Sequence, residues 1–100
     1  MTTLHILNAA AAQSTQLQSC LRFLSAEDGI LLCGEAVQAL RAQSLAAQQL
    51  LACEQIYALY ALEEDVLARG IDATAMPVTL VDYPAFVALT LTYTRVNSWT

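Results

Sequence analysis

The sequence predicts an α/β fold, a small, mainly parallel sheet of four to five strands with helices on both faces. Two observations lead to this class. Short apolar runs, typical of strands buried on both sides, alternate along the chain with segments of helical spacing. This alternation requires crossover connections, which place helices on the faces of a parallel sheet. The 100 residues are expected to form a single domain, residues 1–100, around one core.

The first half of the chain is predicted to contain two strands, each followed by helical sequence. Residues 4–7 form the first predicted strand, and residues 15–24 have the apolar spacing of a helix. An Asp-Gly turn signal precedes the apolar run 30–33, which predicts a strand buried on both faces. Helical spacing returns over residues 35–41, and the alanine- and glutamine-rich stretch 43–52 continues or repeats that helix.

The middle of the chain carries a third predicted strand and a short acidic helix. Residues 55–60 mix β-branched and aromatic side chains without polar alternation, which predicts a buried strand. The acidic run 63–65 follows at once and suits the first turn of a helix, because carboxylates are stabilised at a helix N-terminus. Gly70 is the natural end of this helix. We interpret the acidic run as a solvated helix start, not as a catalytic cluster.

The C-terminal part is predicted to add a fourth strand, a last helix and an edge strand. Residues 78–81 form the fourth strand, and an Asp-Tyr-Pro sequence begins a helix in which Phe86, Leu89 and Tyr93 share one face. Residues 96–99 are predicted to form a short strand at the edge of the sheet. The whole chain is thereby assigned to one layered α/β unit.

The composition points to a covered surface. Hydrophobic residues make up 57% of the chain and charged residues only 13%, against a usual charged share of about a quarter. Either the many alanines inflate the hydrophobic share, or another subunit covers part of the exterior. We favour the second explanation, and so expect a subunit of an oligomer.

Charge and hydropathy exclude two classes of partner. The chain contains no lysine, and its net charge of −5 repels a phosphate backbone, so direct nucleic-acid binding is not expected. The longest apolar runs are far shorter than the roughly 20 residues of a membrane helix. The N-terminal sequence lacks the basic region of a secretory signal, which predicts a cytoplasmic protein.

No cofactor or metal is expected. The chain has neither a glycine-rich dinucleotide loop nor a phosphate loop ending in Gly-Lys-Ser/Thr. Its one histidine, His5, cannot complete a usual zinc site, and a histidine in a strand is most often a structural residue. The three cysteines are odd in number and widely spaced, which fits reduced thiols.

Cys20 is the cysteine whose role the sequence leaves open. On a helical wheel that starts at Leu17, Leu21 and Leu24 lie within about 40°, and Cys20 lies about 60° to the other side. Cys20 therefore sits at the edge of the apolar stripe, where it is either a small buried hydrophobe or a working thiol. The other two cysteines, in or beside predicted strands, are expected to be packed.

Several segments in order carry a resemblance to a known family. They are residues 4–8, residues 27–37, Tyr57-Ala58-Leu59 with residues 64–70, Val81-Asp82-Tyr83 with residues 86–90, and Trp99. The combination of Glu-Asp-Val-Leu-Ala-Arg-Gly with Asp-Tyr-x-x-Phe-Val-x-Leu-Thr and a terminal Trp is specific. Over nearly its whole length, the chain resembles the DsrH/TusB family of sulfur-relay subunits.

The resemblance implies an assembly with paralogous chains. It implies a small α/β subunit that combines with DsrE/TusD-like and DsrF/TusC-like partners in a heterohexamer and serves sulfur-carrier proteins. The principal persulfide cysteine is implied to lie on the DsrE/TusD-like partner. The surroundings of Cys20 are closer to the DsrH-type helix, which carries a cysteine, and they make Cys20 a candidate secondary persulfide carrier.

The sequence is therefore consistent with three functions. The first is a subunit that takes part in passing persulfide sulfur between protein thiols, for tRNA 2-thiouridine synthesis or dissimilatory sulfur oxidation. The second is a purely structural assembly subunit with inert thiols. The third is a homo-oligomeric module that binds a small ligand.

Overall fold

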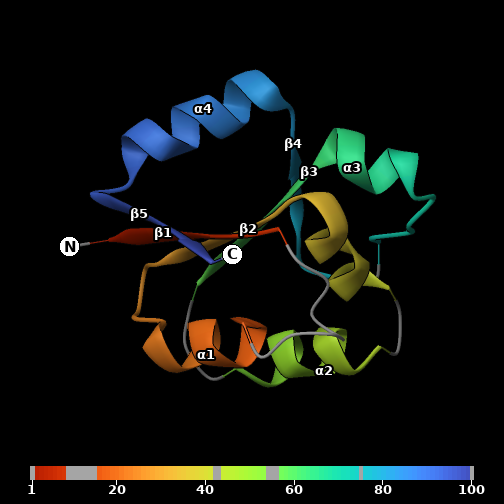
Figure 1. The fold of residues 1–100 in the computed structure, drawn as a ribbon, viewed down its shortest axis with the longest axis horizontal. Coiled ribbons are helices and arrows are strands. Elements are labelled where there is room, and N and C mark those ends of the chain that lie inside the picture. The colour runs from red at the N-terminus through yellow and green to blue at the C-terminus, as the bar shows by residue number, and fades with distance from the viewer. Residues whose placement is uncertain (1, 9–15, 42–43, 54–56, 75, 100) are drawn as a thin grey trace.

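The computed structural model describes residues 2–8, 16–41, 44–53, 57–74 and 76–99. Five strands form one parallel sheet in the order β4-β3-β2-β1-β5 (Figure 1). The strands are β1 (Thr3–Leu7), β2 (Gly29–Leu32), β3 (Ala58–Leu62), β4 (Thr79–Val81) and β5 (Arg95–Trp99). The helices are α1 (Gln16–Phe23), α2 (Leu45–Ala52), α3 (Glu63–Ala68) and α4 (Tyr83–Thr92), with a 3₁₀ helix, η2 (Gly34–Leu40), after β2. The predicted α/β class is confirmed.

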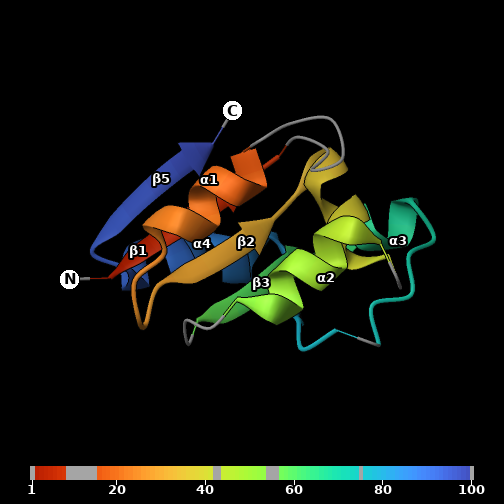
Figure 2. The ribbon, with the colours of Figure 1, turned by 90° about the horizontal axis from the view of Figure 1, so that it is seen from below.

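Helices cover the sheet from both sides. Figures 1 and 2 show α1 and α2 side by side on one face and α4 on the opposite face. The central strand β2 is buried along its whole length, as its continuous apolar sequence predicts. β1 pairs with β2 on one side and with β5 on the other, so the tail of the chain forms the predicted edge strand.

The larger part of the core lies between the sheet and the layer of α1 and α2. It takes Leu17 and Cys20 from α1 and Leu24 from directly after that helix, at the spacing of one helix face. Further buried side chains come from β2, η2 and α2; among them are Ile30, Leu32, Val37, Leu40 and Leu50. Nearly every element contributes apolar side chains to this part of the core.

The core under α4 is much smaller. Among the described residues its buried members are Leu4, Leu31 and Val81, and Phe86, Leu89 and Tyr93 pack against them in part, as their shared face predicts. α4 itself has no buried residue. Its outer side chains remain exposed, with 57% of Val87 and 81% of Leu91 accessible.

Two helices begin at side-chain caps that the sequence supplies. The Ser44 hydroxyl accepts a hydrogen bond from the Ala47 amide at the start of α2, and the Asp82 carboxylate accepts one from the Ala85 amide at the start of α4. α3 ends before Gly70, whose φ of 61° is the left-handed conformation that favours glycine.

The bounds of the third strand differ most from the prediction. The third strand begins at Ala58 and continues to Leu62, two residues past its predicted end. Leu62 remains in the strand because it is buried and pairs with Val81 of β4. Residues 55 and 56, at the start of that predicted strand, and Thr15, the predicted start of the first helix, lie outside the described residues. Within the described ranges, no helix is long and apolar enough to cross a membrane.

Candidate functional site

Cys20 lies at the centre of the buried side of α1. Its side chain has no accessible surface and packs in the core between α1 and the sheet. Burial, reinforced by the negative charge of Asp28 and by the neighbouring Cys53, raises the pKa of the Cys20 thiol to about 12. At neutral pH this pKa leaves roughly one thiolate per 10⁵ molecules. As folded, the chain gives Cys20 neither access to a donor nor appreciable thiolate.

The role proposed for Cys20 from the resemblance stays a prediction. The helical wheel places this residue at the edge of the apolar stripe, and the structure places it inside the stripe with Leu17 and Leu24. Sulfur transfer at Cys20 requires α1 to move away from the sheet, because only an accessible thiolate can attack a persulfide.

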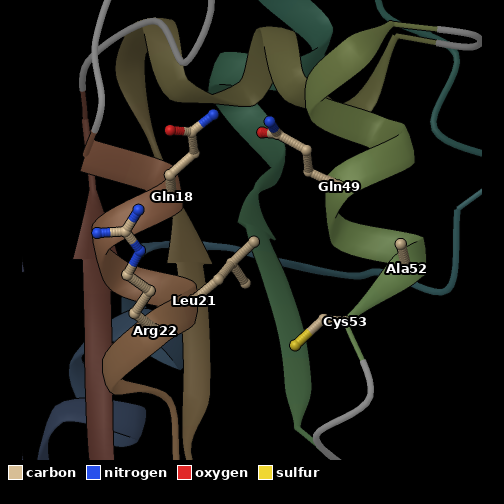
Figure 3. Close-up of a pocket in the computed structure, with 6 residues that line it drawn as sticks. All are labelled: Gln18, Leu21, Arg22, Gln49, Ala52 and Cys53. Atoms are coloured by element: carbon tan, nitrogen blue, oxygen red, sulfur yellow. The ribbon is translucent and has the colours of Figure 1, made fainter.

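The thiol of Cys53 is partly exposed to solvent on the α1 and α2 face of the sheet. Cys53 is the C-cap residue of α2 and is half-buried, although a packed position is predicted from the sequence. Its sulfur points toward a hollow of ≈ 440 Å³ between α1 and α2 (Figure 3). The side chains that line the hollow with it are Gln18, Leu21, Arg22, Gln49 and Ala52.

Cys33 follows β2 at the carboxyl edge of the sheet, where functional groups of parallel sheets gather. Its thiol donates to the Leu7 carbonyl over 3.6 Å, and its side chain is half-buried. Burial, followed by the nearby charge of Asp65, raises the pKa of the Cys33 thiol. This position therefore opposes thiolate formation, in contrast to the environments that activate cysteines.

The three acidic residues at the start of α3 have two different roles. Glu63 and Glu64 are exposed at the first turn, in agreement with a solvated helix start. Asp65 instead accepts a hydrogen bond from the Gly34 amide (2.7 Å) and lies 3.7 Å from the Arg69 guanidinium. Sequence reasoning missed this contact, which ties α3 to the start of η2 across 31 positions.

Arg69 links the same edge through a second ion pair. Its Nη2 lies 2.7 Å from Oε1 of Glu35, and this contact lowers the pKa of the Glu35 carboxyl. Because Glu35 is exposed, the pair contributes little to stability. Within the described part of the chain, no three His, Cys, Asp or Glu side chains gather at metal-binding distance.

His5 belongs to a buried hydrogen-bonded chain of structural residues. The indole Nε1 of Trp99 donates to Nδ1 of His5 (3.1 Å), so Nε2 carries the ring proton and donates to Asp28 (3.2 Å). The amides of Thr3 and Ser25 also donate to Asp28. Both ring nitrogens are partnered, which supports the structural interpretation of His5 over a role as a general base.

Asp28 is held in its ionised form by this network. Burial alone would raise its pKa, but the hydrogen bonds from Ser25, Thr3 and His5 outweigh burial and hold the pKa below its ordinary value. The network joins the start of β2 to β1 and, through Trp99, to β5. It therefore stabilises the end of the sheet that carries the edge strand.

Comparison with known proteins identifies the family. The model of the family described as "DsrH like protein" matches residues 10–96. Protein TusB of Yersinia pestis (strain Pestoides F) is 36% identical over 84 residues, which cover 83% of this chain and 86% of that protein. Protein TusB of Yersinia pseudotuberculosis serotype O:1b has the same identity and coverage.

Two solved structures share the fold. The ychN protein from E. coli superposes with a TM-score of 0.68 at 20% identity, covering 98% of this chain and 99% of that one. Protein Tm0979 from Thermotoga maritima superposes with a TM-score of 0.64 at 23% identity, covering 90% and 92%. The solved structures share the fold, and the family match with the TusB relatives shows that the chain belongs to the DsrH/TusB family, the sulfur-relay family that its motifs resemble.

Proposed function

We propose that the chain is an assembly subunit of a cytoplasmic sulfur-relay complex that passes persulfide sulfur between protein thiols. The complex serves tRNA 2-thiouridine synthesis or dissimilatory sulfur oxidation. In this proposal its partners are DsrE/TusD-like and DsrF/TusC-like chains, and the principal persulfide cysteine lies on the DsrE/TusD-like chain. Family membership supports the relay role, and the surface of α4 supports the assembly role.

The exposed side of α4 is the observation that carries the assembly proposal. The helix contains no charged residue, and it is apolar on the side that faces solvent as well as on the side that faces the sheet. A helix that is apolar all round is normally buried. Val87, Leu91 and Tyr83 are all more than half exposed on this helix. A partner chain that covers α4 would remove this apolar surface from water.

The chemistry of relay disfavours Cys20 and Cys33 as persulfide carriers in the folded chain. In each step a thiolate attacks the outer sulfur of a persulfide, the sulfur–sulfur bond of the donor breaks, and the donor leaves as a thiolate while the acceptor becomes the persulfide. The acceptor must be accessible and ionised. Burial raises the pKa of both Cys20 and Cys33. Cys20 as a secondary carrier is a separate hypothesis that needs an opening of α1.

Co-expression with the two paralogous chains tests the assembly proposal. Native mass spectrometry of the purified material is expected to show one discrete complex that contains all three chains. Leu91→Glu places a charge on the exposed side of α4 and should abolish that complex without unfolding the chain. Leu67→Glu is the matched control, since Leu67 is 69% exposed but lies on α3.

The two leucine variants also discriminate the alternatives. Loss of the complex in Leu91→Glu, with retention in Leu67→Glu, supports α4 as the surface that contacts the partners. Retention in both variants would refute this use of α4. A chain that never binds the paralogues, but retains a small ligand through purification as a homo-oligomer, would favour the third function.

A further inference from the structure

The edge of the sheet at β5 carries backbone groups without a strand partner. β5 pairs with β1 on one side, and no other described segment pairs with its outer side (Figures 1 and 2). The Arg95 amide donates to the Thr2 carbonyl over 3.0 Å. Alternation along a parallel ladder then directs the N–H and C=O groups of Val96 and Ser98 outward. Such a row of groups is a template for another strand.

The side chains of β5 alternate between the two faces of the sheet. Because Asn97 is in register with His5, its side chain and those of Arg95 and Trp99 lie on the α1 face. They line a hollow of ≈ 520 Å³ together with Phe23 of α1. Phe23 is 70% exposed and stacks on Trp99, with 6.1 Å between the ring centroids. Polar and aromatic side chains are thus exposed beside the open strand edge.

We propose that a second copy of this chain binds at this edge, with the two β5 strands antiparallel about a twofold axis that passes beside Asn97. The two sheets then form one continuous sheet across the dimer. A twofold arrangement closes after two chains, whereas a parallel pairing of the same edges has no such closure. A register centred on Asn97 is the one that pairs all five residues of each strand.

The sequence of β5 is complementary to itself in this register. The outward backbone groups of Val96 meet those of Ser98 in the second copy, and the two residues exchange both hydrogen bonds of a closely spaced pair. On the α1 face, Arg95 lies opposite Trp99 of the second copy, which allows a cation–π contact. Arg95 forms no ion pair with any described residue, so this contact breaks none of the described pairs. Asn97 lies opposite Asn97 of the second copy, and the two side-chain amides can hydrogen-bond to each other.

Position-specific cross-linking tests the register. In a Cys33→Ser, Cys53→Ser background, Asn97→Cys places the two introduced thiols of the dimer opposite each other, in a non-hydrogen-bonded pair. The Cα atoms of such a pair are about 4.5 Å apart, within disulfide range. Mild oxidation is expected to produce a covalent dimer. Ser98→Cys is the matched control, because its thiol faces Val96 of the second copy and should not cross-link.

Sedimentation velocity on the full chain provides the second test. The unmodified chain is expected to sediment at twice its mass of 10.8 kDa. Val96→Pro removes an outward N–H and no hydrogen bond to β1, so it should give a monomer that melts cooperatively. Leu91→Glu, on α4, should leave the dimer intact.

Three results would overturn the proposal. The first is a chain that stays monomeric at every concentration. The second is cross-linking that fails in Asn97→Cys or is equal in Asn97→Cys and Ser98→Cys, because either outcome excludes the Asn97 register. The third is a dimer that survives Val96→Pro but dissociates in Leu91→Glu, because this result would assign self-association to α4.

Discussion

The indole nitrogen of Trp99 donates a hydrogen bond to Nδ1 of His5 over 3.1 Å, joining residues 94 positions apart. This bond fixes the histidine tautomer that donates to Asp28. The edge strand β5, the first strand β1 and the turn before β2 are thereby held by one buried polar chain. The stability of this end of the sheet depends on every member having its partner.

Trp99→Phe is expected to lower the free energy of unfolding by about 1–3 kcal/mol, because it leaves Nδ1 of buried His5 without a donor. The phenyl ring retains most of the stacking with Phe23. Urea unfolding measures the change. Phe23→Leu is the control, and its effect should be smaller because Phe23 is mostly exposed. Equal losses in the two variants would show that stacking, not the hydrogen bond, supports β5.

Stability should fall in acid because of Asp28. Its pKa in the folded chain is lower than in the unfolded chain, so the unfolded state binds the proton more readily. The stabilisation is complete above the unfolded pKa, about 4, and is lost as the pH falls through the folded value. In Asp28→Asn, the melting temperature should therefore depend less on pH between about pH 5 and pH 3 than it does in the unmodified chain. An unchanged acid slope in that variant would contradict the assignment.

Gly29→Ala is expected to destabilise the chain by about 1–3 kcal/mol, as overpacking does in a close-packed core. A Cβ at this position would lie 2.8 Å from Cζ of Tyr93, beneath the phenol ring that follows α4. Tyr93→Phe removes the hydroxyl and should recover part of the loss in the double variant. Additive effects in a double-mutant cycle would show that the two residues do not compete for this space.

The folded chain should protect Cys20 from alkylation at neutral pH. Iodoacetamide is expected to label Cys53 first and Cys20 only after unfolding, because the Cys20 thiol is buried with a pKa of about 12. The same raised pKa predicts that stability declines as the pH rises above the ordinary thiol value, since the unfolded chain then loses the Cys20 proton first. Peptide-resolved mass spectrometry distinguishes the three cysteines.

Local patterns in the sequence predict the fold well. The apolar run 30–33 predicts a strand buried on both faces, and β2 is such a strand. The shared face of Phe86, Leu89 and Tyr93 predicts the contact side of α4. These features depend on periodicity over a few residues, which the sequence displays directly.

The candidate site depends on contacts between distant residues, and the sequence predicts it less well. The spacing around Cys20 allows burial or exposure, because a residue at the edge of a helical stripe is decided by the neighbouring helix and sheet. The contact between Asp65 and Gly34 appears only when α3 and η2 meet at the edge of the sheet. The partners of His5 are likewise set by tertiary structure, since one of them is at the other end of the chain.

Peptide-resolved mass spectrometry of the assembled three-chain complex, after exposure to a persulfide donor, tests most directly whether this chain is an assembly subunit. We expect one added sulfur on a cysteine of the DsrE/TusD-like partner, an unmodified Cys20, and intact sulfur transfer in Cys20→Ala. Sulfur added to Cys20 in the folded complex, together with loss of transfer in Cys20→Ala, would instead make this chain a persulfide carrier.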